Sequence, residues 1–369
     1  MKKKKIFYIL SSIDKAIAFE WIVNGLNSDL FELEFVLINS KKGFLFNWLK
    51  EQNVKCHFVE HHSKKDYLKS IFKIYRILIK FKPDVVHCHL LDANLIGLTA
   101  AKAACIKQRI YTRHHSTFHH DYFPEAVKYD RLCNRIATDI VAISENVKSV
   151  LIEKEKCNLK KIHLMHHGFD LEKFKAENTC DLKLKYGLTE TDSPIIGVIA
   201  RYVNWKGLKY VIAAFEKLLI IKPKAKLILA NAYGPNSEDI GLELKKLAQD
   251  SYIEIKFEMD LYSLYHLFDV YVHTPINEEV EAFGQTYVEA LAAGIPSVFS
   301  HSGIANEFIV DGINAIVVPH KEADSIFNGI ELLLNNPNTR ATIVKNGFES
   351  VQQFNLKDFI SKLEFLYIQ

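Results

Sequence analysis

Short apolar runs of strand length alternate along the chain with longer segments in which apolar residues recur every three or four positions. In the first half these runs lie at 5–10, 35–38, 84–89, 109–112, 140–143 and 162–165. A helix is expected at 93–104, and Ser144 stands where the N-cap of another helix is expected. Such alternation predicts a parallel sheet with helices on its faces.

The second half repeats this alternation. Strands are expected at 195–200, 225–230, 270–273 and 296–299, and helices at 208–221, 238–249, 284–293 and 356–367. The fold class predicted is therefore α/β, with two doubly wound, Rossmann-like domains at 1–170 and 171–369. In two-domain folds of this type the last helix, about 356–369 here, often packs back on the first domain.

Length and composition agree with a globular protein of two domains. A chain of 369 residues is too long for one ordinary core. The apolar run in the first ten residues is too short for a signal peptide, and no stretch approaches the roughly 18 apolar residues of a membrane span. We therefore expect a cytoplasmic protein. The six cysteines are scattered and are expected to be reduced.

The charge of the chain is unevenly distributed. Residues 1–170 hold 28 Lys and Arg against 18 Asp and Glu, a net charge of +10. The whole chain carries +3, which leaves −7 for residues 171–369. The basic first half is expected to meet an anionic partner, whether membrane, phosphate or nucleic acid.

An acidic loop and the helix after it form the most informative segment, 275–296. A strand ends at His273, the acids follow, and a helix begins near Gly284. Free N–H groups at such a helix start attract phosphate. Glu281 precedes the helix and can reach a group attached to that phosphate, and Glu289 can accept hydrogen bonds from vicinal hydroxyls. The alternative is a solvated loop with surface acids.

Two cationic residues follow the first strand of the second half. Arg201 and Lys206 stand between that strand and the helix predicted at 208–221. A pyrophosphate offers more oxygens than one cation neutralises, so the two side chains can hold one anion from two sides. Taken alone, they are typical surface charges.

These segments resemble signature elements of glycosyltransferase family 4. Glu281-Ala282-Phe283-Gly284 with Glu289 and the Ala-Gly-x-Pro that follows is similar to its E-x7-E motif, and Arg201 to Gly207 is similar to its R-x4-K-G element. The segments 167–174, 142–145 and 302–307 also resemble family elements.

The resemblance implies the GT-B fold, with a cleft between the two domains, and sugar transfer from a UDP- or GDP-type donor with retention and without a metal. Arg201, Lys206 and the amides near Phe283, Gly284 and Gln285 would hold the donor diphosphate. Glu289 would hold the ribose and Glu281 would orient the sugar. No cofactor is implied beyond this substrate.

The first domain both fits and departs from the family pattern. Tyr111-Thr112-Arg113-His114 resembles the T-x-H at a strand end, which implies that His114 faces the transferred sugar, with His115 as the alternative. The family usually has a Gly-Gly turn after the first strand. Here Ser11-Ser12 occupies that turn, so no first-domain phosphate contact is assigned.

Several histidines also fit a metal site. His87 and His89 lie on one face of a strand, and a second group is found in the segment 114–121, at His114, His115, His119, His120 and Asp121. Family members commonly have V-x-H-x-H at the strand that carries His87 and His89, and they bind no metal there, so no metal is predicted.

A basic amphipathic helix is expected within 64–82. Its apolar positions are 68, 71, 72, 75, 78 and 79, and lysines and Arg76 lie on the other side. It either packs its apolar side into the core or contacts an anionic membrane. No aromatic and basic recognition pattern accompanies the charge, so nucleic acid is not an expected partner.

We therefore expect a retaining, hexosyltransferase-like enzyme that acts on a glycan or lipid-linked acceptor, by resemblance in capsule, lipopolysaccharide or glycolipid synthesis. Three other classes stay open. They are a nucleotide-sugar epimerase or phosphorylase on the same fold, a metal-dependent hydrolase built on the first-domain histidines, and a catalytically silent scaffold.

Overall fold

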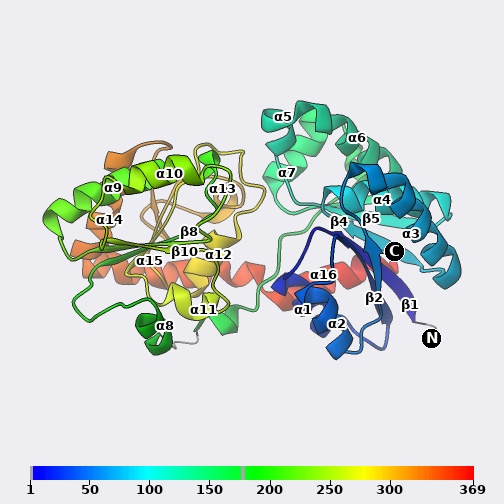
Figure 1. Cartoon of the computed structure of the whole chain (residues 1–369), viewed down its shortest axis with the longest axis horizontal. Helices are drawn as coiled ribbons and strands as arrows, with labels where there is room; N and C mark the ends of the chain where they lie inside the picture. The colour runs from blue at the N-terminus through cyan, green and yellow to red at the C-terminus, as the bar shows by residue number, and fades with distance from the viewer. Residues whose placement is uncertain (1–2, 176–178) are drawn as a thin grey trace. The chain divides into compact units, whose positions relative to one another are not determined.

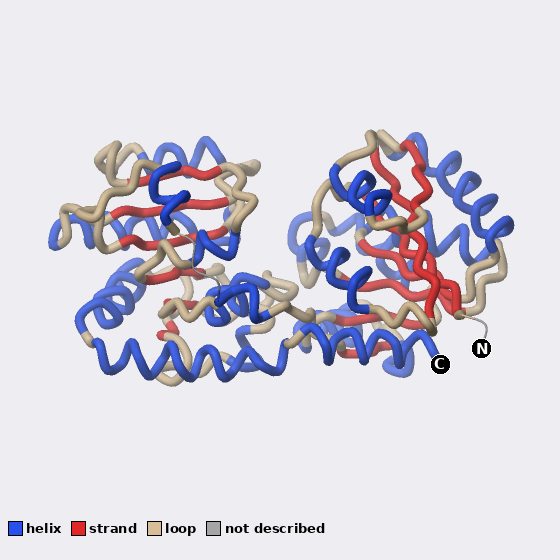
Figure 2. Tube along the Cα trace, turned by 90° about the horizontal axis from the view of Figure 1, so that it is seen from below, coloured by secondary structure: helices blue, strands red, loops and turns tan. Residues whose placement is uncertain are grey.

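The computed structural model describes residues 3–175 and 179–369, and it divides into two compact units (Figure 1). The first unit consists of Met1–Phe169 together with Leu356–Gln369, and the second of Asp170–Asn355. Each unit contains one parallel sheet with helices packed on its faces, as the strands and helices of Figure 2 show. The α/β class and the two doubly wound sheets are confirmed.

The first unit has seven parallel strands in the order β3-β2-β1-β4-β5-β6-β7. The strands are β1 Lys4–Ser11, β2 Phe31–Asn39, β3 Cys56–Glu60, β4 Val85–His89, β5 Gln108–Arg113, β6 Asp139–Ala142 and β7 Ile162–Leu164. Its helices are α1 Ile17–Gly25, α2 Phe44–Glu51, α3 Tyr67–Phe81, α4 Leu91–Ala103, α5 Phe118–Tyr122, α6 Val127–Ile136, α7 Glu145–Ser149 and α16 Leu356–Ile368.

The second unit has six strands in the order β10-β9-β8-β11-β12-β13. The strands are β8 Ile195–Ile199, β9 Lys226–Ala230, β10 Tyr252–Ile255, β11 Val270–His273, β12 Ser297–Phe299 and β13 Ile316–Val317. Its helices are α8 Cys180–Lys185, α9 Leu208–Ile221, α10 Ser237–Leu244, α11 Leu261–Tyr265, α12 Gln285–Ala292, α13 Ala305–Phe308, α14 Ala323–Asn335 and α15 Pro337–Ser350.

Continuous burial explains why the central strands are apolar throughout. In β1 every residue from Ile6 to Leu10 has no solvent exposure, as expected for a parallel strand covered on both faces. The expected return of the last helix is also confirmed. Tyr367 of α16 is buried in the first unit, where its hydroxyl is hydrogen-bonded to that of Tyr8.

Three strands, β3, β10 and β13, are absent from the sequence-based assignment. Each is the outermost strand at one end of its sheet. Each contains a single buried residue, Val59 in β3, Ile255 in β10 and Ile316 in β13, so none has the continuous apolar run that marks a central strand. The helix expected at 238–249 is α10, which ends earlier, at Leu244.

The helix expected within 64–82 is α3, but its apolar side does not all face the core. The core-facing residues are Ser70, Ile74 and Leu78. Leu68, Phe72 and Ile79 are 82%, 60% and 45% exposed, so the interpretation that packs the apolar side into the core holds for Leu78 but not for these three residues. Within the described part of the chain, no helix has both the length and the hydrophobicity needed to cross a membrane.

Candidate active site

The acidic loop and the R-x4-K-G element meet at one edge of the second sheet. They follow β11 and β8, which are neighbours, while β9, the strand after β8 in sequence, lies on the other side of β8. The strand order therefore reverses at β8. In doubly wound sheets ligands bind outside the carboxyl ends of the strands at such a point.

Gly207 allows the loop after β8 to pack tightly against the chain that leaves β11. It adopts a left-handed conformation with φ of 73°, and a Cβ at this position would lie 2.1 Å from the carbonyl oxygen of Thr274. Beside it, the Ile276 N–H donates to the carbonyl of Trp205 at 3.0 Å. Only glycine permits this approach, and the approach positions Lys206.

Lys206 and Glu281 form an ion pair at this edge. Lys206 Nζ lies 2.5 Å from Glu281 Oε1, and Nε2 of His273 lies 3.5 Å from the same oxygen. Burial raises the pKa of Glu281, but Lys206 and His273 outweigh that effect and lower it below its usual range. Glu281 is therefore ionised at neutral pH although it is buried.

Arg201 lies close by in sequence but is exposed. Its guanidinium makes no ion pair with any carboxylate of the described residues, whereas Lys206 is neutralised by Glu281. The structure thus places one free and one paired cation in the loop after β8.

The helix start after the acidic loop has the form expected for anion binding. Gly284 precedes α12 with φ of 86°, and a Cβ there would lie 2.6 Å from the ring of Tyr287. Phe283 is buried against Phe354, with ring centroids 5.9 Å apart, and Gln285 is exposed. The first amides of a helix have no partner within it, so this start offers N–H donors.

Glu289 lies on α12 and is half-buried. The hydroxyl of Tyr265 donates to its Oε2 at 2.7 Å. Burial raises the pKa of this carboxyl, and the Tyr265 hydrogen bond partly opposes the rise. The bond fixes one carboxylate oxygen and leaves the other as an acceptor for a ligand.

Two buried polar atoms at this edge lack a hydrogen-bond partner among the described residues. They are the hydroxyl of Thr274, directly after β11, and Nδ1 of His273, the last residue of β11. Buried polar groups are almost always hydrogen-bonded. Their concentration here indicates a site that receives a polar ligand.

The 302–307 loop supports the acidic loop from behind. Gly303 has φ of 57°, and a Cβ there would lie 2.7 Å from the carbonyl oxygen of Phe283. The N–H of Ile304 donates to that carbonyl at 2.9 Å, and the N–H of Glu281 donates to Ser302 Oγ at 3.2 Å. This loop therefore holds the backbone of Glu281 and Phe283 in place.

Sequence reasoning missed two side chains of this site, Tyr265 and His273, and it gave no role to Ser302 within the segment 302–307. The signal for His273 was present, because it ends a strand directly before the acidic loop. Tyr265 lies on a short helix far from both motifs, and only the fold brings it to Glu289.

In the first unit, His114 and His115 diverge. Nε2 of His114 lies 3.0 Å from Nδ1 of His89, and its ring stacks on His167 with centroids 5.7 Å apart. Burial and the neighbouring His167 lower the pKa of His114 to about 3. The ring is therefore neutral at physiological pH, and one of its nitrogens is already engaged by His89.

The H-x-H pair on β4 is used within the core. The two rings lie on one face of the strand, as expected, with centroids 4.3 Å apart. His87 has both nitrogens engaged, Nδ1 by the hydroxyl of Tyr367 at 2.7 Å and Nε2 by Thr112 Oγ1 at 2.8 Å. His87 is therefore unavailable to a metal.

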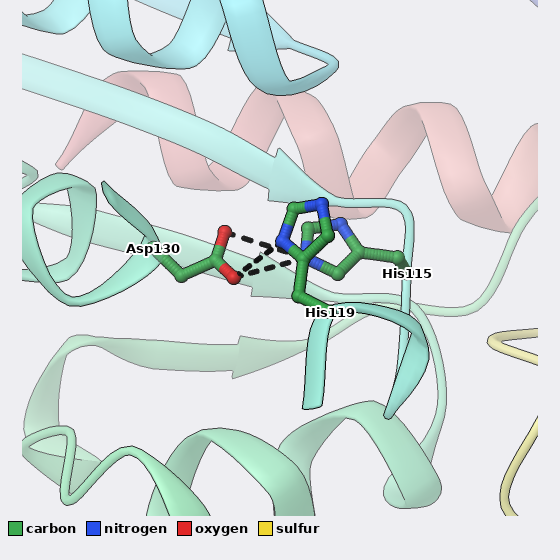
Figure 3. A group of neighbouring side chains, drawn as sticks. All are labelled: His115, His119 and Asp130. Carbon is green, nitrogen blue, oxygen red and sulfur yellow. Dashed lines mark hydrogen bonds and ion pairs between the residues drawn. The ribbon is translucent and has the colours of Figure 1, made fainter. Parts of the chain in front are cut away.

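A second group of histidines does gather around a carboxylate, but the carboxylate differs from the one expected. His115 and His119 both point at Asp130 of α6 (Figure 3), with Nδ1 of His119 2.6 Å from Oδ2. Asp121 is not in this group. The guanidinium of Arg113 lies 3.2 Å from Asp130 Oδ1, so a positive charge already compensates this carboxylate.

Comparisons with known proteins bear on both units. The family model described as Glycosyl transferases group 1 matches residues 183–350, and that described as Glycosyltransferase Family 4 matches residues 40–173. The capsular polysaccharide biosynthesis glycosyltransferase CapM of Staphylococcus aureus is 28% identical, over 100% of this chain and 97% of its own length. An Escherichia coli UDP-Gal:alpha-D-GlcNAc-diphosphoundecaprenol alpha-1,3-galactosyltransferase is 23% identical, over 91% and 89%.

The fold has a solved counterpart as well. The crystal structure of Anabaena HepE in complex with UDP and glucose superposes with a TM-score of 0.85 at 18% identity, covering 99% of this chain and 100% of that one. One family model matches the first unit from β3 to β7, and the other spans all six strands of the second sheet. The chain therefore belongs to glycosyltransferase family 4 and has the GT-B fold.

Proposed function

We propose that this glycosyltransferase moves a sugar from a UDP- or GDP-sugar to a glycan or lipid-linked acceptor, in the synthesis of a surface polysaccharide or glycolipid. The relatives named for capsule synthesis and for a diphosphoundecaprenol acceptor support the substrate class. The observation that carries the proposal is the Lys206–Glu281 pair beside the α12 start, at the point where the strand order of the second sheet reverses.

The second unit would hold the donor. Arg201, Lys206 and the amides near Phe283, Gly284 and Gln285 would bind the diphosphate and stabilise the charge that develops on it as the sugar departs. Electrostatic stabilisation of this kind is usually the largest single contribution to catalysis. Glu289, fixed through Tyr265, would accept hydrogen bonds from the ribose hydroxyls.

Glu281 would orient the sugar, and the transfer would retain the anomeric configuration. Its carboxylate is ionised and held by Lys206, which suits hydrogen-bond acceptance from sugar hydroxyls. When the diphosphate binds, Lys206 would contact both the carboxylate and a phosphate oxygen, and so couple the position of the sugar to that of the leaving group.

The reaction would need no metal and no cofactor. Transfer of a sugar from a nucleoside diphosphate requires positive charge near the departing diphosphate. This site offers two basic side chains and a helix start for that purpose. A metal bound at His115, His119 and Asp130 would lie beside the guanidinium of Arg113, which already compensates the charge of Asp130.

His114 would serve the first unit's side of the reaction as a neutral hydrogen-bonding group to the transferred sugar. With a pKa of about 3, its ring is a poor proton acceptor at neutral pH. We assign it to orientation of the sugar, and we expect no titration of this ring near pH 7.

The first unit would bind the acceptor and rest on the cytoplasmic face of an anionic membrane through α3. The exposed Leu68, Phe72 and Ile79 recur along one side of the helix. Lysines border them at 65, 69 and 80. An exposed apolar row with flanking lysines is typical of helices that lie at a membrane surface.

The test is a thermal-shift screen of UDP, GDP and ADP and their sugars, with and without a chelator, on the wild type and Glu289→Ala. Binding should raise the melting temperature by mass action, with one nucleotide preferred and the shift lost in the variant. Turnover of that sugar nucleotide only with an acceptor supports transfer. Turnover without an acceptor would indicate an epimerase, and turnover that depends on inorganic phosphate would indicate a phosphorylase. Loss of activity on addition of the chelator would indicate a metal-dependent enzyme. If no nucleotide raises the melting temperature, the catalytically silent scaffold is the remaining interpretation.

A further inference from the structure

A pocket in the first unit lies apart from His114. It has a volume of about 450 Å³, at the carboxyl ends of β1, β2 and β3. The residues that matter to the argument are Ser12, Lys41, His61, Lys64, Tyr67 and Asp92. One strand of the sheet, β4, lies between β1 and β5, and His114 directly follows β5.

Two lysines and two carboxylates line this pocket, and no ion pair joins them among the described residues. Lys41 and Lys64 make no ion pair with any carboxylate in the described part of the chain. The two acids that line the pocket are engaged by neutral donors. Asp14 accepts from the N–H of Phe44 at 2.7 Å, and Asp92 accepts from the hydroxyl of Tyr67. The two lysines are thus left for an anionic ligand.

A buried histidine adds a directed polar group. His61 is 9% exposed, its Nδ1 is 3.0 Å from Ser70 Oγ, and its ring stacks on Tyr67 with centroids 5.4 Å apart. These contacts fix the ring, and its other nitrogen forms no hydrogen bond to a described residue. Because the ring lines the pocket, this nitrogen is available to a ligand there.

The backbone at this edge is strained at two adjacent points. Ser12 has φ of 54° and Leu90 has φ of 74°. They follow β1 and β4, which run side by side with Leu10 opposite His89. Left-handed conformations of such residues cost roughly 1–2 kcal/mol each and concentrate at functional sites. The strand order of this sheet also reverses at β1, between β2 and β4.

We propose that this pocket binds the phosphate or diphosphate group of the acceptor. The inference rests on the proposed function and names its acceptor as a phosphorylated molecule. Lys41 and Lys64 neutralise the phosphate, and His61 contributes a hydrogen bond. Tyr67, which lines the pocket, is the first residue of α3 and is followed by the exposed Leu68. The lipid chain of a lipid-linked acceptor would leave the pocket along the apolar side of α3.

The first experiment titrates inorganic pyrophosphate by calorimetry into four proteins: wild type, K41Q/K64Q, K102Q/K107Q and R201Q/K206Q. Lys102 and Lys107 are exposed lysines of the first unit outside the pocket. The proposal expects one binding event that K41Q/K64Q weakens about tenfold or more, since each lost charge-assisted hydrogen bond is worth about 1.5–3 kcal/mol. That event should persist in K102Q/K107Q and R201Q/K206Q. Equal binding in wild type and K41Q/K64Q would overturn it.

The second experiment separates a lipid headgroup from a soluble phosphate. Wild type and K41Q/K64Q are sedimented with phosphatidylcholine vesicles that carry or lack a polyprenyl phosphate, and are titrated with a soluble sugar phosphate. If wild type binds one of the two ligands more tightly than K41Q/K64Q does, the site is supported and that ligand is identified as the source of the phosphate. If wild type and K41Q/K64Q bind both ligands equally well, the proposal is overturned. Nucleotide binding is measured in parallel. If no nucleotide binds but phosphate binding still depends on Lys41 and Lys64, the proposed function is wrong and the proposal for the pocket is supported.

Discussion

Lys206 and Glu281, 75 residues apart in the chain, form an ion pair of 2.5 Å that joins the two strand ends of the candidate donor site. One partner comes from the loop after β8 and the other from the loop after β11. Each alone fits a surface charge, whereas together they form a partly buried contact beside a helix start. The pair is therefore the first feature to test.

Glu281→Gln should reduce kcat/KM by about 100-fold or more, the scale seen when one preorganised polar group is lost. Nucleotide affinity should change little, because Lys206 and Arg201 remain. Kinetics and thermal shift measure the two effects separately. Glu278→Gln, an exposed acid of the same loop, is the control. Near-normal turnover of Glu281→Gln would remove this residue from the catalytic set.

Gly207→Ala should destabilise the second unit far more than Gly187→Ala. Both glycines are left-handed, with φ of 73° and 65°, but only a Cβ at 207 meets a carbonyl oxygen, at 2.1 Å. The conformational cost alone is about 1 kcal/mol, and the clash should raise it to about 3 kcal/mol for Gly207. Denaturant unfolding gives both values. Equal losses would mean that the loop is not held against Thr274.

Acid should destabilise the first unit through its buried histidines. Burial lowers the pKa of His87 to about 3, below the ordinary 6.5, so the unfolded chain binds a proton that the folded chain excludes. Stability is then complete above pH 6.5 and falls as the pH drops towards 3, by about 1.4 kcal/mol per pH unit for this group. Melting from pH 8 to 4 should show the slope. It should be smaller in His87→Gln and unchanged in His62→Gln, an exposed control.

Asp130→Asn should cost about 3 kcal/mol, because it leaves the buried guanidinium of Arg113 with only Glu155 as a carboxylate partner. Asp121→Asn, an exposed acid nearby, should cost little. Thermal unfolding with and without a chelator measures both. A chelator that destabilises the wild type to the level of Asp130→Asn would show that a metal holds this cluster.

Replacing exposed apolar residues of α3 should weaken membrane binding without weakening the fold. Leu68→Ser/Phe72→Ser should bind anionic vesicles about tenfold less well, since each side chain contributes about 1.5–3 kcal/mol when fully buried in an apolar medium. Leu184→Ser/Ile220→Ser is the matched control, with residues 84% and 79% exposed in the second unit. Equal loss in both double variants, or none in either, would contradict a specific role of α3.

The central strands and the motif positions could be predicted because both depend on local sequence. Continuous apolar runs identify buried parallel strands, and α9 has the bounds expected for it, 208–221. Edge strands such as β3 carry no such run. The apolar side of α3 shows why periodicity alone is insufficient. The pattern identifies an amphipathic helix, but neighbouring elements decide which side is buried, and here Ile74 is inside while Phe72 is outside.

Contacts between residues far apart in the chain could not be predicted from the sequence. The spacing of Arg201, Lys206, Glu281 and Glu289 was readable as a motif, but the bonds of Lys206 to Glu281 and of Tyr265 to Glu289 depend on strand order. The histidines show the same limit. Asp121 is the nearest acid to His119 in sequence, yet a helix further along the chain brings Asp130 to it instead.

The return of α16 to the first unit constrains how this protein is made. Residues 356–369 leave the ribosome after the second unit, and they include Tyr367, which is buried against Tyr8 and His87. The second unit is continuous in sequence and is complete before that point, so it can fold first during synthesis. The first unit, although most of it precedes the second unit in sequence, is complete only once α16 has been made. A fragment that stops at residue 169 would expose the apolar surface that α16 covers. Such a fragment would lack a complete core and would be expected to bind chaperones instead of folding as an independent domain.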